Sequence, residues 1–416
     1  MPPRWRLRPW RPVVARFRRL VRRDADALRQ GFVALLIACG GSFLAGLTLG
    51  AIEGTLEELP GLLLLVPAAI GMRGNIFGAL GSRLGTAIRT GTFVLSRRTD
   101  TLVGQNITAA VALSLVISLL LAFLAKLVAI GFGLPGTISV PEFVVISVVG
   151  GALSSVVVLA ITVAVAEASV RRGWDLDNVA APIVTAAGDV ATLPALYLAT
   201  LLVDRSWLTD GIAGVCIAGA FAVLVLALRS KRVAFRRIIR ESLPILAVAG
   251  VVDVVAGLTI EKRLDGFLTF PALLILIPPF LEASGALGGI LTSRVSTKLH
   301  LGLVEPSRFS LRPVGEDVLL TVVYAIPVFF LVGVSTDLAS LVTGRASPGV
   351  LDMIGVAMLA GTFATAAALV VAYYGAAAAY RFGLDPDNFG IPVVTSSLDL
   401  LGAYSIVIAL VMLGIV

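Results

Sequence analysis

The stretch LPGLLLLVPAAIGMRGNIFGALGSRLGTAIRTG, residues 59–91, returns later in the chain as FPALLILIPPFLEASGALGGILTSRVSTKLHLG, residues 270–302. Identical residues recur in the two stretches at a constant spacing of 211 residues, beginning with Pro60 and Pro271. A ladder of identities at one spacing indicates an internal repeat. Both copies are predominantly apolar, so the repeated unit is itself hydrophobic.

Two further motifs extend the repeat on either side. The tetrapeptide AGLT occurs at 45–48 and again at 256–259. The segment DLDNVAAPIVTAAGDV, residues 175–190, is matched by DPDNFGIPVVTSSLDL, residues 385–400, at a spacing of 210 residues. The two copies therefore cover nearly the whole chain, and the sequence predicts two versions of one folding unit.

The composition is that of an integral membrane protein. Apolar residues make up 58% of the 416 residues, only 14% are charged, and the mean hydropathy is +0.99. A soluble domain has about half apolar and roughly a quarter charged residues, so a soluble protein is excluded. The apolar runs reach the ~20 residues that a helix needs to cross a bilayer, and the alternation of barrel strands is not seen.

We expect an all-α polytopic membrane protein with eleven transmembrane helices. The predicted spans are approximately 30–50, 60–81, 104–132, 138–169, 179–202, 209–228, 243–261, 268–291, 316–342, 350–380 and 389–415. Each repeat holds five spans, and the span at 209–228 lies between the copies without a partner. Five spans would invert the second copy, and the extra span restores its orientation. The two repeats should therefore run parallel about a pseudo-twofold axis along the membrane normal.

The charge pattern predicts the orientation of the chain. It has a basic cytoplasmic arm (1–29), a first five-span repeat (30–203), a linker span with a basic cytoplasmic loop (204–240) and a second five-span repeat (241–416). Basic residues such as Arg83 and Arg294 cluster at one set of span ends, and acidic residues such as Glu57, Glu58 and Asp210 lie at the other. The positive-inside rule then predicts a multi-pass protein of the cell membrane, with its N-terminus cytoplasmic and its C-terminus outside. The net charge of +7 reports topology and contact with the lipid bilayer, not nucleic-acid binding.

Two carboxylates lie where a bilayer is least tolerant of charge. A helix beginning near Asn388 reaches Asp399 after ~16 Å, close to the middle of a ~30 Å hydrocarbon core, and Asp189 is the repeat counterpart. A charged Asp at that depth costs about 2.5–3.5 kcal/mol, so both residues need compensation. Either each is protonated or hydrogen-bonded to a neighbouring helix, or both line one polar cavity and share a cation. The repetition favours the shared cation.

Further oxygen-bearing residues accompany these aspartates. Thr185 and Thr395 each lie four residues before the aspartate of their repeat, on the same helix face. Asp253 is a third mid-span carboxylate, for which a role in cation binding and a structural hydrogen-bonding role are equally open. In the second span of each repeat, Pro67 and Pro278 with the glycines that follow them predict a break that exposes backbone to a cavity.

The available donors favour a hard divalent cation. Carboxylate, hydroxyl, amide and carbonyl oxygens suit Mg²⁺, Mn²⁺ or Ca²⁺. The single histidine of the sequence, His300, lies near a cytoplasmic end, which disfavours a zinc or copper site built from imidazole and thiolate. A small number of carboxylates around a hydrated ion suits Mg²⁺ best, with Mn²⁺ or another divalent cation as the alternative. No organic cofactor is expected.

The repeated segments resemble the magnesium transporter superfamily that contains MgtE, and most of all its solute-carrier family 41 branch. VPAAIGMRGNIFGALGSRLGTA and SRVSTKLH resemble that branch's first-repeat and second-repeat segments, and the two segments that carry Asp189 and Asp399 resemble its two fifth-span motifs. The resemblance covers nearly all of residues 30–416. It implies divalent-cation transport, chiefly of Mg²⁺, through a pore between two five-span units. Those units are two subunits in MgtE and would here be a fused pseudo-dimer.

The resemblance also assigns roles to individual residues. Asp189 and Asp399 match the family's central ion-binding Asp, and Asn75 matches the Asn of its second-span motif. Glu261 matches an acidic position after the AGL motif, although its first-repeat counterpart is Gly50. The regulatory N-terminal and CBS domains of MgtE have no counterpart in this sequence, so its gating mechanism is not implied.

A second departure from the family pattern concerns the second span of the second repeat. Ala286 stands where that repeat would carry the Asn, and Glu282, four residues earlier, is a candidate to supply an oxygen instead. The two halves are therefore not equivalent, and a symmetric site is not implied.

Three other functions compete with a Mg²⁺ channel or transporter. An exchanger or exporter coupled to Na⁺ or H⁺ is favoured by the surplus acid of Asp253, Glu261 and Glu282. An intramembrane aspartyl protease would use Asp189 and Asp399 as a dyad, but its usual GxGD pattern is broken by Ala186. A membrane scaffold would leave both aspartates without a role in ion binding. We expect a transport protein and not an enzyme.

Overall fold

The computed structural model describes residues 25–93, 101–172, 176–203, 205–305, 311–383 and 390–415. Most of the predicted basic arm lies outside these residues. Its last five residues, 25–29, already belong to the first long helix. The remaining statements about the structure concern this described part of the chain.

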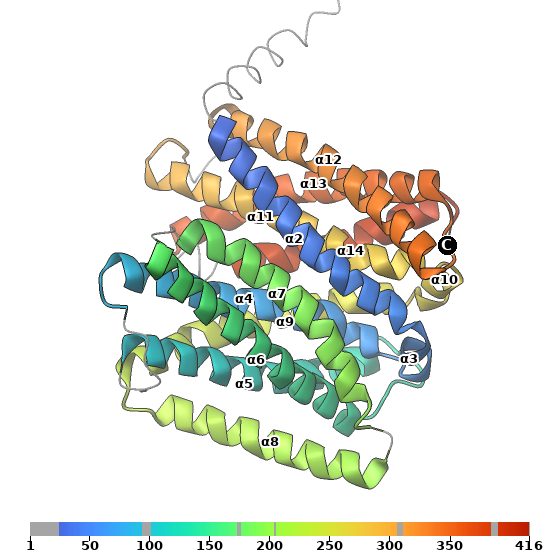
Figure 1. The fold of residues 1–416 in the computed structure, drawn as a ribbon, viewed down its shortest axis with the longest axis horizontal. Coiled ribbons are helices and arrows are strands. Elements are labelled where there is room, and N and C mark those ends of the chain that lie inside the picture. The colour runs from blue at the N-terminus through green and yellow to red at the C-terminus, as the bar shows by residue number, and fades with distance from the viewer. Residues whose placement is uncertain are drawn as a thin grey trace, which may run out of the picture.

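The described residues form helices joined by short connections, without a strand (Figure 1). Eleven of these helices are long and apolar enough to cross a membrane, and each coincides with one predicted span. They are α2 (Ala25–Ala51), α4 (Leu62–Arg89), α5 (Leu102–Gly131), α6 (Val140–Arg172), α7 (Leu176–Thr200), α8 (Ser206–Arg229), α9 (Val233–Glu261), α11 (Ala272–His300), α12 (Leu311–Thr343), α13 (Val350–Arg381) and α14 (Ile391–Met412). The prediction of an all-α polytopic membrane protein is confirmed.

Two short helices were not predicted from the sequence. Helix α3 (Glu53–Glu58) follows the first long helix of the first repeat, and α10 (Leu264–Thr269) follows the first long helix of the second. They begin 211 residues apart, the same spacing as the repeat. Each anchors itself through one buried apolar side chain, Leu56 or Phe267, and these two residues are also repeat counterparts. The ladder of equivalent residues therefore extends into the connections.

The prediction of broken second spans is wrong. Pro67 lies inside the uninterrupted helix α4, and Pro278 lies inside the uninterrupted helix α11. A proline removes one hydrogen bond of the helix, whereas an opened turn would leave several backbone groups unpaired in an apolar surrounding. Both helices also continue beyond their predicted ends, to Arg89 and His300, because their last turns are too polar to be detected by hydropathy.

The first helix of each repeat packs against the other repeat. Helix α2 lies between α7 of its own repeat and α11 of the second. Helix α9 correspondingly lies between α14 of its own repeat and α4 of the first. Figure 1 shows the blue helix α2 crossing the front of the second repeat's helices. The two repeats are therefore interleaved, and their second helices, α4 and α11, lie at the centre with long runs of buried residues.

Glycines make these crossings possible. Gly46 of α2 and Gly257 of α9 are the glycines of the two AGLT motifs. A methyl group on Gly46 would overlap the backbone carbonyl of Ile275 in α11, and one on Gly257 would overlap the carbonyl of Leu63 in α4. The same close approach thus occurs twice, at equivalent places in the two repeats. This correspondence supports the parallel arrangement that the sequence predicts.

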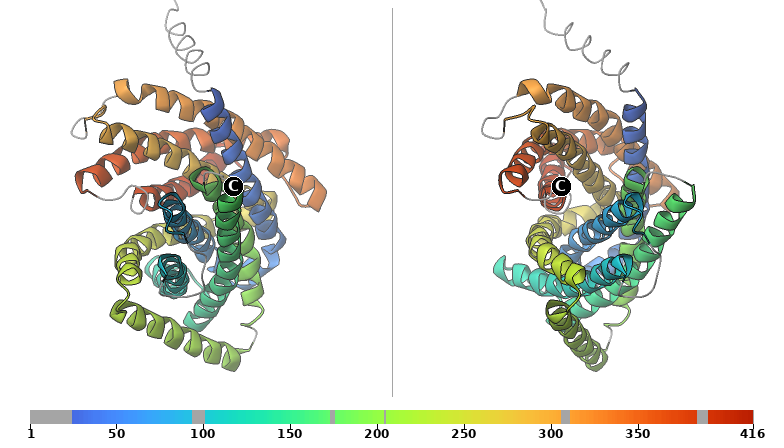
Figure 2. Two further views of the ribbon diagram at one scale, coloured as in Figure 1. Left: turned by 60° about the vertical axis from the view of Figure 1, so that its left-hand side comes forward. Right: turned by 90° about the vertical axis from the view of Figure 1, so that its left-hand side faces the viewer.

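Helix α8 is the span without a repeat partner, and it lies at the edge of the bundle. It runs along the lower border of Figure 1 and stays peripheral in both views of Figure 2. It packs on α5 and α6 and touches α9. Its other face exposes large apolar side chains, among them Trp207, Val215 and Phe221. Such a surface is suited to lipid, so α8 connects the repeats without entering the core.

Candidate cation-binding site

Asp189 lies inside the bundle, where α7 packs against α2. Its side chain is 2% exposed, and the hydroxyl of Ser42 on α2 donates a hydrogen bond to its Oδ2 atom. Asp189 is 13 residues beyond the start of α7, which places it near the middle of the helix. A single neutral hydroxyl satisfies little of a carboxylate's capacity to accept hydrogen bonds, so this oxygen cluster is suited to a cation.

Asp253 and Asp399 approach each other beside Gly71. They come from α9 and α14, and their Oδ2 atoms lie 3.1 and 3.5 Å from the position that a Cβ atom on Gly71 would take. The Asp253 side chain is fully buried, and neither of its oxygens has a hydrogen-bond partner. The Ser396 hydroxyl of α14 faces this carboxylate without reaching hydrogen-bonding geometry. Two carboxylates thus converge on one small space next to the α4 backbone.

Glu282 of α11 belongs to the same central region. Its charge acts electrostatically on both Asp189 and Asp399, as the charge of Asp253 acts on Asp399. The repeat spacing makes Glu282 the counterpart of Gly71. The structure therefore brings together four of the carboxylates that the sequence singled out: Asp189, Asp253, Glu282 and Asp399.

These carboxylates do not form one compact cluster. Among the described residues, no group of three or more His, Cys, Asp or Glu side chains is close enough to hold a metal ion on its own. A cation held here would complete its coordination with hydroxyls, backbone carbonyls or water. Such a sparse ligand set is the one that a hydrated Mg²⁺ ion uses.

The predicted hydroxyl ligands lie on the helices of Asp189 and Asp399, and the Thr395 hydroxyl donates a hydrogen bond to the Pro392 carbonyl at 3.2 Å. The methyl groups of Thr185 and Thr395 face Gly74 and Gly285, so both threonines pack toward the second helix of their own repeat. Asn75 lies four residues after Gly71, on the same face of α4. Its Nδ2 atom is buried and has no hydrogen-bond partner in the described structure. Asn75 therefore has an unused hydrogen-bond donor one helical turn from Gly71, where Asp253 and Asp399 approach each other.

Glu261 lies apart from the other predicted ligands. It ends α9, about 12 Å along the helix from Asp253. Its Oε1 atom accepts the N–H of Gly61 at 2.6 Å, and its Oε2 atom accepts the N–H of Leu63 at 3.3 Å. The carboxylate therefore caps the first turn of α4, where unpaired N–H groups and the helix dipole favour a negative charge. The structure gives Glu261 a helix-capping geometry and does not bring it to the central carboxylates.

Comparison with known proteins identifies the family to which this chain belongs. A model of the MgtE family, described as a divalent cation transporter, matches this chain twice, over residues 66–199 and 277–409. These two matches cover most of the chain and are spaced like the repeat. The chain belongs to the MgtE family. Members of this family are transporters of divalent cations and not enzymes, which sets the protease hypothesis aside.

Individual relatives of this MgtE-family chain point to one branch. Solute carrier family 41 member 3 of Rattus norvegicus is 25% identical, over 90% of this chain and 84% of the relative. Solute carrier family 41 member 2 of Mus musculus is 27% identical, over 90% of this chain and 68% of the relative. The resemblance to the solute-carrier family 41 branch is confirmed. No solved structure matches the chain at a significant level.

Arg73 is a residue of this MgtE-family chain that the sequence interpretation missed. The guanidinium group is 1% exposed within the first repeat, between α4, α5 and α6. It donates to Ser154 at 3.1 Å, to Ser114 at 2.5 Å and to Ser118 at 2.7 Å. All three partners are neutral hydroxyls, so no carboxylate is paired with this guanidinium among the described residues. An arginine within an apolar run was the signal that could have identified it.

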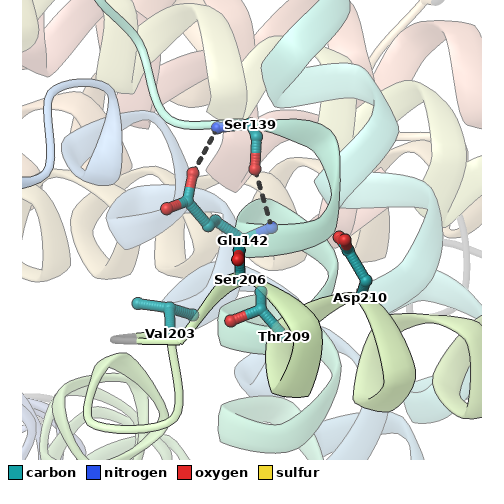
Figure 3. A pocket seen from close by; sticks show the side chains of 6 residues that line it. All are labelled: Ser139, Glu142, Val203, Ser206, Thr209 and Asp210. Carbon is teal, nitrogen blue, oxygen red and sulfur yellow. Dashed lines mark hydrogen bonds between the residues drawn. The ribbon is translucent and has the colours of Figure 1, made fainter.

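A polar hollow of about 220 Å³ lies at the surface, and none of Asp189, Asp253 and Asp399 lines it (Figure 3). It is lined by Ser139, Glu142, Val203, Ser206, Thr209 and Asp210. Glu142 accepts the N–H of Ser139 at 2.5 Å, and its own N–H donates to the Ser139 hydroxyl at 3.4 Å. This reciprocal pattern caps the start of α6. The Glu142 carboxylate is accounted for by helix capping.

Proposed function

We propose that this protein carries Mg²⁺ across the cell membrane along the interface between its two repeats, and that Asp189 and Asp399 bind the ion near the membrane midplane. The observation that carries the proposal is the pair itself. The two carboxylates occupy counterpart places on the fifth helices of the two repeats, and each lies near further carboxylates in the bundle interior. Burying several such charges is costly unless a cation accompanies them. One fused chain supplies both sides of the pathway.

The choice of Mg²⁺ rests on the donor atoms. The carboxylates, the Ser42 hydroxyl and the side-chain oxygen of Asn75 are hard oxygen donors, and no imidazole is among them. Mg²⁺ keeps several of its waters and needs few protein carboxylates, which suits pairs better than a closed cage of ligands. Mn²⁺ is the nearest competitor, because it prefers similar ligands.

The orientation of the helix ends supports a cytoplasmic N-terminus. The ends of α4, α6 and α8 that carry Arg89, Arg171 and Arg229 belong to one side of the bundle. The opposite side carries acidic residues such as Glu53 and Glu142. Because the basic side faces the cytoplasm in most membrane proteins, the C-terminus lies outside.

Coupled exchange is the second candidate. Four central carboxylates carry more negative charge than one divalent cation neutralises, so a second ion or protons would balance the remainder. Mg²⁺ flux that responds to an imposed Na⁺ or pH gradient would favour an exchanger, and flux that ignores both gradients would favour a passive pathway.

The proposed function is tested by Mg²⁺ uptake into proteoliposomes. Wild-type protein is compared with Asp189→Asn, Asp399→Asn and the double variant, each checked for folding by size-exclusion chromatography. We expect each single change to lower the initial rate at least about tenfold, the equivalent of roughly 1.4 kcal/mol of lost stabilisation. Wild-type flux should prefer Mg²⁺ over Ca²⁺ in competition.

Asp210→Asn is the matched control. It removes a carboxylate from the peripheral helix α8, far from the proposed pathway, and should leave the rate unchanged. Unaltered uptake by the folded Asp189→Asn/Asp399→Asn variant would reject the proposed ion position.

A further inference from the structure

Two of the central differences between the repeats concern carboxylates, and in both the carboxylate belongs to the second repeat. Ser42 in the first repeat corresponds to Asp253 in the second, 211 residues later. Gly71 in the first repeat is replaced by Glu282 in the second, at the same spacing. The first repeat thus lacks a carboxylate at each of two places where the second repeat has one.

Because the repeats interleave, two of these four residues lie near Asp189 and the other two lie near Asp399. Ser42 on α2 and Glu282 on α11 come from different repeats but from helices that pack together, and both act on Asp189. Asp253 on α9 and Gly71 on α4 likewise come from different repeats, and both adjoin Asp399. Glu282 is therefore a neighbour of Asp189 and Asp253 a neighbour of Asp399, and the charge of Glu282 also acts on Asp399.

This arrangement creates two pairs. The first carboxylate pair is Asp189 with Glu282, and the second carboxylate pair is Asp399 with Asp253. The extra carboxylate comes from the second helix in the first pair and from the first helix in the second pair. Each pair thus contains two carboxylates, although a different helix of the repeat supplies the second one.

The space available explains why the two changes go together. A Cβ atom on Gly71 would lie 3.1 Å from the Asp253 Oδ2 atom, so a longer side chain at position 71 would compete with Asp253 for the same volume. At the other pair, the counterpart of Asp253 is the short Ser42, which leaves room for the Glu282 side chain. A carboxylate at one position thus excludes a carboxylate at the other.

We propose that the two pairs are two adjacent Mg²⁺ positions along one pathway, in which Asp253 and Glu282 perform the same ligand role from different helices. The inference rests on the proposed function and deepens it, because Asp189 and Asp399 then each bind an ion with a partner carboxylate and do not share a single ion. Two carboxylates match the charge of one divalent cation, so each position is electrically balanced when filled. The buried Asp253 oxygens, which lack hydrogen-bond partners, are then accounted for as ligands.

Adjacent positions also explain how an ion can leave. The charge of Asp399 interacts with those of Asp189 and Glu282, so the two positions are electrostatically linked. An ion arriving at one position repels an ion at the other, which lowers its affinity. Conduction needs sites that are strong enough to be filled and, through several sites in series, weak enough to be emptied.

The test is to move the carboxylate between helices. Asp253→Ser should lower Mg²⁺ flux roughly 10- to 100-fold, the range seen when a metal site loses supporting groups. The double variant Asp253→Ser/Gly71→Glu rebuilds the arrangement of the first pair at the second and should recover most of the flux. Glu282→Gly, with Ser42→Asp/Glu282→Gly as its rescue, is the reciprocal experiment.

Equilibrium Mg²⁺ titration of the purified full chain supplies an independent readout. Wild-type protein should bind a second Mg²⁺ that the isosteric variants Asp253→Asn and Glu282→Gln each lose, while one ion remains bound. These conservative variants test the inference even where a transplanted side chain hinders folding.

The possible failures are distinguishable. If Asp189→Asn and Asp399→Asn abolish flux, but wild-type protein binds one ion and neither transplant restores activity, the two-position inference is overturned and the proposed function stands. If wild-type protein carries no Mg²⁺, the proposed function fails and this inference fails with it. Rescue by both transplants, with two bound ions in wild-type protein, supports the inference.

Discussion

The hydroxyl groups around Arg73 hold a charge that no carboxylate neutralises in the described structure. Because hydrogen bonds to charged groups contribute more than neutral ones, Ser118→Ala should lower the free energy of unfolding by about 1.5–3 kcal/mol. Ser169→Ala is the matched control, since this buried serine has no hydrogen-bond partner and its loss should matter little. Unfolding in detergent measures both changes. Equal losses of stability in the two variants would contradict a special role for the hydroxyls at Arg73.

Single residues differed in how well the sequence revealed them. The sequence singled out Asp189 and Asp399 as intramembrane carboxylates, because a charge in the middle of an apolar run is rare and this one occurs twice. The contact of Ser42 with Asp189 could not, since serine is unremarkable within a membrane helix. Gly71 is one of the glycines after Pro67 for which the sequence predicts a helix break; the helix is uninterrupted there, and the glycine instead leaves space for Asp253.

The first turn of α4 depends on a carboxylate from another helix. Glu261→Ala should lower the free energy of unfolding by about 0.5–2 kcal/mol, the usual cost of losing an N-terminal cap. Mg²⁺ affinity should stay unchanged, because Glu261 lies about two turns of α9 from Asp253. Chemical unfolding and Mg²⁺ titration of the same preparation separate the two effects. A large loss of Mg²⁺ affinity with normal stability would identify Glu261 as an ion ligand, as the family resemblance implies.

Hydropathy predicted all eleven long helices but not their polar ends. The last turn of α11 carries Lys298, which forms an ion pair at 2.5 Å with Asp317 of α12. Such turns extend beyond the apolar part of the helix and are stabilised by ion pairs. An average of hydropathy over a stretch of sequence therefore does not detect them. The helices α3 and α10 have six residues each, too few for a periodic pattern to indicate a helix.

The assembly of the whole molecule depends on two equivalent close contacts between repeats. Gly46→Ala and Gly257→Ala should each destabilise the protein by about 1–3 kcal/mol, because the added methyl group meets backbone that cannot move aside. Gly40→Ala on α2 is the matched control, since open space surrounds that position. Thermal unfolding in one detergent compares the three variants. If Gly46→Ala were as stable as Gly40→Ala, the crossing of α2 over α11 would not be tightly packed.

Five spans in each repeat and one extra span between them were enough to predict parallel repeats. The number of spans could not predict that the repeats interleave. A constant spacing shows which residues are equivalent, without showing which repeat each one contacts. Gly71 and Glu282 illustrate the limit, because the spacing identifies them as counterparts while only the packing of α4 and α11 assigns them to opposite carboxylate pairs. For the same reason the sequence predicted a central acidic region but not its division into pairs.

The cap that Glu261 places on α4 has a consequence for biosynthesis. Gly61 and Glu261 are separated by 200 residues, so a ribosome adding about 5–20 residues per second makes the cap roughly 10–40 s after the turn it satisfies. During that interval the nascent α4 lacks the carboxylate that caps its first turn, and its contact surface for α9 is uncovered. The first repeat is therefore an immature intermediate, and insertion factors that shelter newly made helices would be needed most between the emergence of α4 and that of α9.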